Sequence, residues 1–334
     1  MKKLFALILA GIMCLSLVAC GGSDAPAEDS SGDAATEETT DPAAETYTVG
    51  ICQLVQHVAL DAATQGFMDA LNEALPGQVE FDNQNASNDI PMCSTIINQF
   101  VASEVDLILA NATPALQAAS AATIDIPILG TSITEYGVAL EIADFSGTVG
   151  GNVSGTSDLA PLDEQAAMLA EWFPDAKNVG LLYCSAEANS QYQVDVVKAE
   201  LEALGYTATL YSFSDSNDLA AVTESAVAAS DVIYVPTDNT VAANTGIIDN
   251  ICQPAGVPVI AGEEGICSGC GVATLSISYY DLGVATGKMA AKILTGEADI
   301  AAMPIEYAPA TPKYNPTICE ALGLTAPEGY VAIG

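Results

Sequence analysis

Polar side chains that could bind a small molecule lie in short segments, each of which follows a run of apolar residues. They comprise amides, hydroxyls, carboxylates and one imidazole, and they are Gln56, His57, Thr113, Ser132, Thr134, Glu187, Asn189, Ser190, Asp238, Asn239, Glu263 and Glu264. Asp238 or a glutamate could hold an ammonium group, while Thr113, Ser132 and nearby helix N–H groups could hold a carboxylate. This combination favours a polar site for a small zwitterion.

A simpler role is open to each of these residues. Asp, Asn, Ser and Thr are also preferred at helix N-caps, where the side chain accepts a backbone hydrogen bond. His57, the only histidine of the chain, could contact a ligand or serve only in packing or capping. Considered together, the residues indicate a shared binding cleft more than a set of separate helix N-caps.

Catalytic motifs are absent from the sequence. One histidine cannot supply an HExxH zinc site, and no Gly-x-Ser-x-Gly segment occurs. The segment 283–289 is one residue short of a phosphate-binding loop and lacks its Ser or Thr. The neighbouring Glu263 and Glu264 are a poor guide to the carboxylate separation of a glycosidase. We therefore predict a protein that is not an enzyme, without cofactor or metal.

Cysteine usage gives no disulfide framework. Seven cysteines follow Cys20, an odd number without regular spacing. Cys267 and Cys270 form the one close pair, but no second pair or histidine accompanies them. We predict an ordinary loop there, with free or locally bridged thiols.

The candidate site residues must be positioned by strands and helices, which the sequence predicts as alternating short apolar runs and longer helical patterns. Strands are expected at 48–54, 79–82, 106–112, 127–132, 179–184, 207–213, 232–237 and 257–262. Helices are expected at 59–74, 91–102, 114–122, 162–173, 191–204, 218–229, 241–253 and 279–295. Strands with apolar residues on both faces are typical of parallel sheets covered by helices. The pattern predicts a doubly wound α/β fold whose ligands bind beyond the carboxyl ends of the strands.

A segment rich in glycine and hydroxyls, 146–158, interrupts this alternation near the middle. Strand–helix units precede and follow it, and the part from 47 to 334 is larger than one hydrophobic core usually serves. The sequence therefore predicts two similar parallel-sheet lobes joined by a hinge.

The N-terminal residues have the composition of an export segment. Lys2 and Lys3 precede an apolar run, and Leu17-Val18-Ala19-Cys20 follows. This arrangement resembles the lipobox of bacterial lipoproteins, in which the cysteine is acylated. We expect a signal peptide over 1–19, lipidation of Cys20, and an acidic, disordered tether over 20–46 that holds the protein at the outer face of the cell membrane.

The net charge of the chain limits the classes of molecule that it could bind. The chain contains 43 acidic residues, seven lysines and no arginine, for a net charge of −36. Nucleic-acid binding needs a basic surface, so this class is excluded. A bound carboxylate also could not be held by a guanidinium group.

Ordered motifs resemble the substrate-binding lipoproteins of ABC transporters related to the tryptophan/tyrosine type. They are 50–62 (GICQLVQHVALDA), 66–67 (GF), 112–115 (ATPA), 151–158 (GNVSGTSD), 187–190 (EANS), 234–239 (YVPTDN), 262–265 (GEEG) and 280–283 (YDLG). The resemblance implies a type I periplasmic-binding-protein fold with three crossovers. It also implies lobes formed by 47–155 plus 279–302 and by 156–278 plus 303–334, with a hinge near 154–158 and 276–278.

The function implied by the resemblance is capture of a small ligand outside the cytoplasm for an ABC permease and ATPase. We expect a monomer whose lobes close on an amino acid, with an aromatic one as a candidate. Alternatives are a nucleobase or peptide-like amine as ligand, a sensor subunit for a membrane signalling protein, and an exported α/β enzyme.

Overall fold

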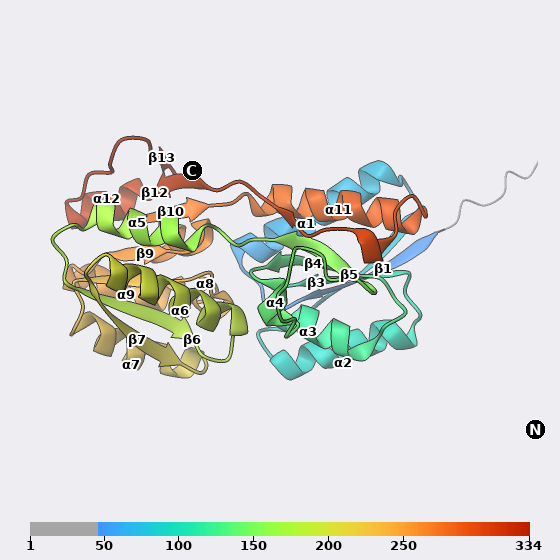
Figure 1. Ribbon diagram of the computed structural model, residues 1–334, viewed down its shortest axis with the longest axis horizontal. Helices are drawn as coiled ribbons and strands as arrows, with labels where there is room; N and C mark the ends of the chain where they lie inside the picture. Colours follow the sequence, from blue (N-terminus) through green and yellow to red (C-terminus); the bar gives the residue numbers. More distant parts are fainter. Residues whose placement is uncertain (1–45) are drawn as a thin grey trace, which may run out of the picture. The chain divides into compact units, whose positions relative to one another are not determined.

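Two β-sheets, each between two layers of helices, form the part of the chain that the structure describes, residues 46–334 of a computed structural model (Figure 1). The first sheet has the order β11-β5-β4-β3-β1-β2, and all its strands are parallel. Its strands are β1 (Tyr47–Gln53), β2 (Val79–Asn85), β3 (Leu107–Asn111), β4 (Ile128–Ile133), β5 (Val153–Ser157) and β11 (Glu306–Tyr307).

The helices of the first lobe cover both faces of this sheet. They are α1 (Val58–Ala74), α2 (Ile90–Ala102), α3 (Thr113–Ala122), α4 (Tyr136–Ala139), α11 (Tyr279–Leu294) and the short 3-10 helix η1 (Ile300–Ala302). Strand β3 explains the arrangement: Leu107 and Leu109 belong to the core beneath α1 and α11, whereas Ile108 and Ala110 belong to the core beneath α2 and α3. Successive side chains of a strand point to opposite faces, so a strand buried on both sides is apolar throughout.

The second sheet has the order β13-β12-β10-β9-β8-β6-β7, with β12 antiparallel to β10. Its strands are β6 (Asn178–Cys184), β7 (Thr207–Phe213), β8 (Val232–Val235), β9 (Val259–Ala261), β10 (Ala273–Ser276), β12 (Thr311–Tyr314) and β13 (Val331–Ala332). Its helices are α5 (Leu162–Trp172), α6 (Ala188–Ala203), α7 (Ser216–Val227), α8 (Asn239–Ala242), α9 (Thr245–Ala255), α10 (Glu264–Cys270) and α12 (Pro316–Leu322). Two α/β lobes of this kind confirm the predicted fold class.

The chain passes between the sheets three times: after β5, between β10 and α11, and between β11 and β12. The structure corrects the predicted lobe boundaries in two places. Strand β5 stays in the first sheet as far as Ser157, and β11 pairs with β5. Residues 156–157 and 306–307 therefore belong to the first sheet, because the ends of both strands hydrogen-bond there.

Three local predictions were also wrong. The glycine-rich segment 146–158, to which the sequence assigns no strand, contains β5, whose residues are all buried. The helix expected over 241–253 is divided into α8 and α9. Cys267 and Cys270 lie in helix α10, and their thiols are buried and free, as are the other cysteines of the described part.

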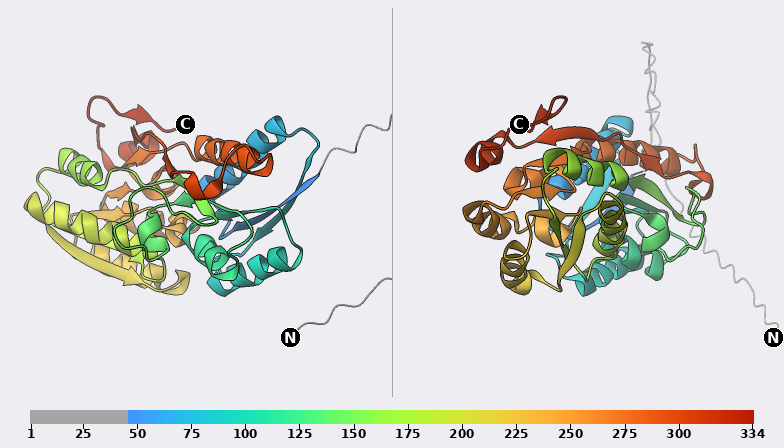
Figure 2. Two further views of the ribbon diagram at one scale, coloured as in Figure 1. Left: turned by 45° about the vertical axis from the view of Figure 1, so that its right-hand side comes forward. Right: turned by 60° about the vertical axis from the view of Figure 1, so that its left-hand side comes forward.

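Glycines allow α1 and α11 to pack with their backbones in close contact. A Cβ atom on Gly66 would lie 2.1 Å from the carbonyl oxygen of Tyr280, and one on Gly283 would lie 2.0 Å from that of Ala63. The two helices run side by side in both views of Figure 2. His57 directly precedes α1 and Tyr279 begins α11, so this contact also helps to position two side chains of the site described below.

Within residues 46–334 no helix is both long and apolar enough to cross a membrane. The predicted signal peptide, Cys20 and nearly all of the acidic tether lie outside the described residues.

Candidate functional site between the lobes

A small cavity lies where the carboxyl ends of strands from both sheets meet. Its volume is about 10 Å³, which is room for about one water molecule. It is lined by His57, Leu60, Ser132, Thr134, Asp158, Asn189, Thr237, Asp238, Asn239, Ala242, Glu263 and Tyr279. Most of these side chains are polar and none is a lysine, so the cavity suits a ligand that brings its own positive charge or hydrogen-bond donors.

Seven of the predicted site residues line this cavity: His57, Ser132, Thr134, Asn189, Asp238, Asn239 and Glu263. The other five do not line it. Gln56 is exposed and borders an open polar depression of the first lobe, and Thr113 is buried in the first turn of α3. Glu187 and Ser190 are buried at the start of α6.

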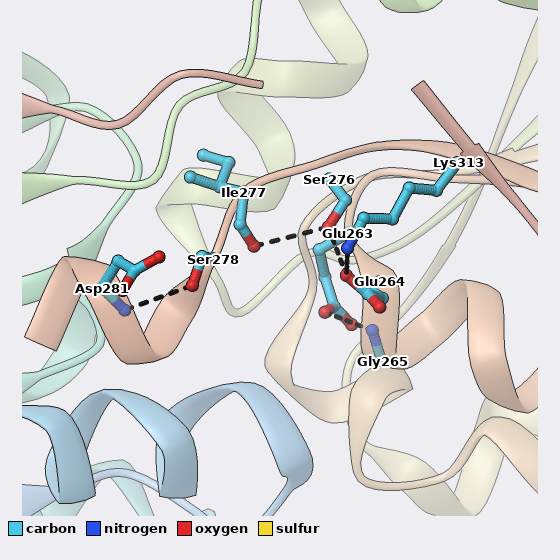
Figure 3. Close-up of polar contacts among 8 residues, drawn as sticks. All are labelled: Glu263, Glu264, Gly265, Ser276, Ile277, Ser278, Asp281 and Lys313. Atoms are coloured by element: carbon cyan, nitrogen blue, oxygen red, sulfur yellow. Dashed lines mark hydrogen bonds and ion pairs between the residues drawn. The ribbon is translucent and has the colours of Figure 1, made fainter. Parts of the chain in front are cut away.

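Glu264 takes part in a different cluster, shown in Figure 3. Its carboxylate accepts a hydrogen bond from Ser276 at 2.5 Å and forms an ion pair with Lys313 at 2.6 Å. Ser276 ends β10 just before the second crossing between the lobes, and Glu264 and Lys313 belong to the second lobe as well.

The capping role left open by the sequence applies to the expected ammonium ligands. Asp238 accepts backbone hydrogen bonds from Cys184 at 2.7 Å and Val241 at 2.9 Å. Glu263 accepts from Gly265 and Ile266 at the start of α10. Because both oxygens of each carboxylate already have backbone donors, these groups shape the site more than they offer themselves to a cation.

Asp158 is the carboxylate that keeps a free oxygen. Its Oδ2 atom accepts a hydrogen bond from the Tyr279 hydroxyl at 2.8 Å, whereas its buried Oδ1 atom has no partner. Burial raises the pKa of Asp158, because the charged form loses its hydration. The sequence prediction does not include Asp158, nor the other lining residues Leu60, Thr237, Ala242 and Tyr279. Asp158 directly follows β5, so recognition of that strand would have placed it among the residues at strand ends.

Other polar atoms that line the cavity also have no partner. They are Nδ1 of His57, Oδ1 of Asn189 and Oγ of Ser132, all buried. Thr113, which begins α3 and does not line the cavity, also has an unpartnered Oγ1 atom. Buried polar groups normally have hydrogen-bond partners, so unpartnered ones grouped around one cavity indicate a binding site.

Backbone strain accompanies these groups in the first lobe. Ser132 has φ of 56° at a register shift in β4, and Ala112 has φ of 92° just before α3. Positive φ costs a residue with a Cβ atom about 1–3 kcal/mol and is typical of functional sites. The strain lies at two strand ends that point towards the cavity.

Two hydrogen bonds join the lobes across the site. His57 Nε2 lies 3.3 Å from Oδ1 of Asn239, and Asn88 Nδ2 donates to Oγ1 of Thr240 at 3.1 Å. His57 and Asn88 belong to the first lobe, and the other two residues begin α8 in the second. The structure therefore has a closed arrangement of the lobes.

Buried carboxylates should make the stability of this closed form depend on pH. Burial, followed by the charge of Glu187, raises the pKa of Asp238 to about 8, and burial raises the pKa of Glu263 to about 7. The folded state then binds protons more tightly than the unfolded state, so stability falls as pH rises through these values. The pKa of His57 is lowered by burial, so its opposite effect is confined to lower pH. We expect the free energy of unfolding in urea to fall by about 2 kcal/mol from pH 6.5 to 8, and a rise over this interval would contradict the assignment.

Two parallel-sheet lobes, three crossings and a polar cavity at the facing strand ends define a two-lobed solute-binding protein. The chain belongs to the family of ABC transporter substrate-binding proteins, whose model matches residues 48–332. Members of this family bind solutes outside the cytoplasm and are not enzymes. Among residues 46–334 no cluster of side chains could hold a metal ion.

Similarity to a named relative and to a solved structure supports this assignment. The chain is 35% identical over 301 residues to a tyrosine-binding protein of Clostridioides difficile, covering 89% of this chain and 85% of the relative. It is 32% identical, with a TM-score of 0.82, to an ABC domain from Streptococcus pneumonia in complex with L-Trp, covering 86% of this chain and all of that one.

A third relative bears on the conformation. The ligand-free, open structure of a substrate-binding protein with adhesive properties from Clostridium difficile is 37% identical but has a TM-score of only 0.66, over 86% of this chain and 99% of that one. The structure described here is thus more similar to the L-Trp complex than to the open protein of higher identity. This difference agrees with the hydrogen bonds that join the lobes.

Proposed function

We propose that this protein is a lipid-anchored receptor that captures an amino acid, with aromatic ones as the first candidates, and delivers it to an ABC permease and ATPase. The observation that carries the proposal is the cavity with several unpartnered acceptors, one of them a carboxylate, and no lysine. An ammonium group supplies both the charge and the donors that such a site lacks.

The two ends of an amino acid find complementary groups on different sides of the site. Oδ1 of Asp158 is free to accept from the ammonium group. The hydroxyls of Ser132 and Thr113 are free to donate to the carboxylate, and Thr113 begins the ten-residue helix α3, whose N-terminal N–H groups favour negative charge. This assignment needs no arginine, which the chain does not contain.

Binding requires the lobes to separate for entry and then to close again around the ligand. A cavity of about 10 Å³ is too small for an amino acid, so the His57–Asn239 and Asn88–Thr240 contacts must open for entry. A ligand favours closure only to the extent that it binds the closed state more tightly than the open one. Because the unpartnered groups come from both lobes, only the closed state brings all of them into contact with the ligand. Hinge motion about the three crossings therefore links ligand binding to closure.

A thermal-shift screen of amino acids, nucleobases and sugars tests the ligand class. We expect an amino acid to raise the melting temperature, because ligand at a thousand times its Kd adds about 4 kcal/mol of stability. Stabilisation by a nucleobase or sugar, with no effect of any amino acid at millimolar concentration, would contradict the proposal.

The lipid anchor has a separate test. Cys20→Ser removes the thiol that acylation requires, so we expect the protein to move from the membrane fraction to the soluble fraction outside the cell. Fractionation and immunoblotting would measure this change. Retention of the Cys20→Ser variant at the membrane would show that another segment holds it there.

A further inference from the structure

We propose that closure of the lobes fixes the tautomer of His57, so that Nδ1 can only accept a hydrogen bond and the bound ligand must present an N–H or O–H group to it. The proposal rests on the proposed function and adds one requirement on the ligand. It follows from a chain of hydrogen bonds that runs from Glu187 through Asn239 to His57.

The chain starts at the buried side chain of Glu187, whose two oxygens accept four hydrogen bonds. Its Oε2 atom receives hydrogen bonds from the backbone N–H of Asn239 at 3.0 Å and from the Asn239 side-chain Nδ2 at 2.7 Å. Its Oε1 atom receives them from the backbone N–H and hydroxyl of Thr240 at 2.9 and 2.8 Å. Glu187 thereby orients both residues of α8 that contact the first lobe.

The orientation of Asn239 dictates that of the proton on His57. Because Nδ2 of Asn239 must donate to Glu187, its Oδ1 atom faces the first lobe, where it lies 3.3 Å from Nε2 of His57. An amide oxygen can only accept, so Nε2 must carry the proton. In a neutral imidazole the other nitrogen, Nδ1, is then an acceptor.

The environment of His57 favours the neutral form of its ring. Burial lowers its pKa despite the opposing effects of Asn239, Glu187 and Asp61. Its Nδ1 atom is buried, has no partner within the described residues, and belongs to a side chain that lines the cavity. A ligand group placed against it must therefore be a donor.

A second residue of the cavity is oriented by the same carboxylate. Nδ2 of Asn189 lies 3.3 Å from Oε2 of Glu187 and donates to the carbonyl oxygen of Thr237 at 3.1 Å. Its Oδ1 atom is consequently left as an unpartnered acceptor. Glu187, although it does not line the cavity, thus acts as a positioning residue that turns acceptors of both lobes towards the ligand.

The requirement exists only when the lobes are closed. His57 belongs to the first lobe, and Glu187 and Asn239 belong to the second, so an open protein leaves either imidazole tautomer available. A compound with an acceptor at this position can enter the open cleft, but closure then sets two acceptors against each other, which disfavours the closed complex.

Nitrogen NMR of the full chain labelled with ¹⁵N-histidine tests the proposal, because His57 is the only histidine once a purification tag has been removed. At pH 7, in complex with the compound that the thermal-shift screen identifies, we expect a neutral ring with the proton on Nε2. A proton on Nδ1, or on both nitrogens, would overturn the proposal. Failure of the amino-acid proposal would appear instead in the screen, as binding by another ligand class.

Two variants test whether the hydrogen-bond chain, and not the ligand alone, determines which nitrogen of His57 carries the proton. Asn239→Ala removes the acceptor for Nε2 and should raise the fraction of ring protonated on Nδ1, with roughly tenfold weaker binding. Asn88→Ala removes the other hydrogen bond that joins the lobes across the site and should leave the tautomer unchanged. If Asn239→Ala leaves the tautomer of the bound state unchanged, the chain from Glu187 has no role and the proposal is overturned.

Discussion

Asp158→Asn is expected to reduce ligand affinity by about two to three powers of ten, the largest loss from any single substitution in the cavity. The amide can still accept from the Tyr279 hydroxyl, but it then turns its NH₂ group towards the ammonium in place of the free carboxylate oxygen. Removing one member of a buried charge pair costs about 2–5 kcal/mol. Titration calorimetry with the compound found by the screen would measure the loss.

Asp158→Asn should also leave the ligand-free protein as stable as before or more so. Burial raises the pKa of this carboxyl group, so its ionised form is unfavourable without a ligand. Glu264→Gln is the matched control, because Glu264 pairs with Lys313 away from the cavity and should affect affinity little. Equal affinities of Asp158→Asn and the unchanged chain would remove Asp158 from the ammonium site.

Gly283→Ala is expected to destabilise the protein by about 1–3 kcal/mol, although alanine is ordinarily the better residue in a helix. The added Cβ atom would lie 2.0 Å from the carbonyl oxygen of Ala63, so α1 and α11 must separate. His57 and Tyr279 stand at the ends of these helices, and binding should weaken as well. Urea denaturation with and without ligand would measure both effects.

Gly246→Ala supplies a control with the same chemical change. Gly246 is exposed in α9, has no positive φ, and nothing lies within 4 Å of a Cβ atom added there. We expect this substitution to stabilise the protein by about 0.5 kcal/mol. Equal effects of the two substitutions would contradict the close packing of α1 and α11.

The fold could be predicted largely because its strands and helices have clear and different periodicities. The strand over 207–213 was predicted with its observed bounds, and β1, β3 and β6 within one residue at each end. Strand β5 was missed because glycine and hydroxyl residues have low apolar content, and its burial comes from neighbours that the sequence does not reveal. The short β11 is a strand only because it pairs with β5.

The location of the site could be predicted from the sequence, but the hydrogen-bond partners of its polar residues could not. Strand ends of parallel sheets gather at one edge, so His57, Ser132 and Asn239 could be placed there from the sequence. The partner of each polar group is a tertiary property. No local pattern shows that Asp238 is used by backbone N–H groups while an oxygen of Asp158 is free.

Titration calorimetry of the purified protein with L-tyrosine and L-tryptophan tests the central claim most directly. We expect one site per chain that binds at least one of them, and weaker binding by amino-acid analogues that lack the ammonium group. Absence of binding by every amino acid at millimolar concentration, in a protein that denatures cooperatively, would contradict the assignment of the cavity between the lobes as an amino-acid site.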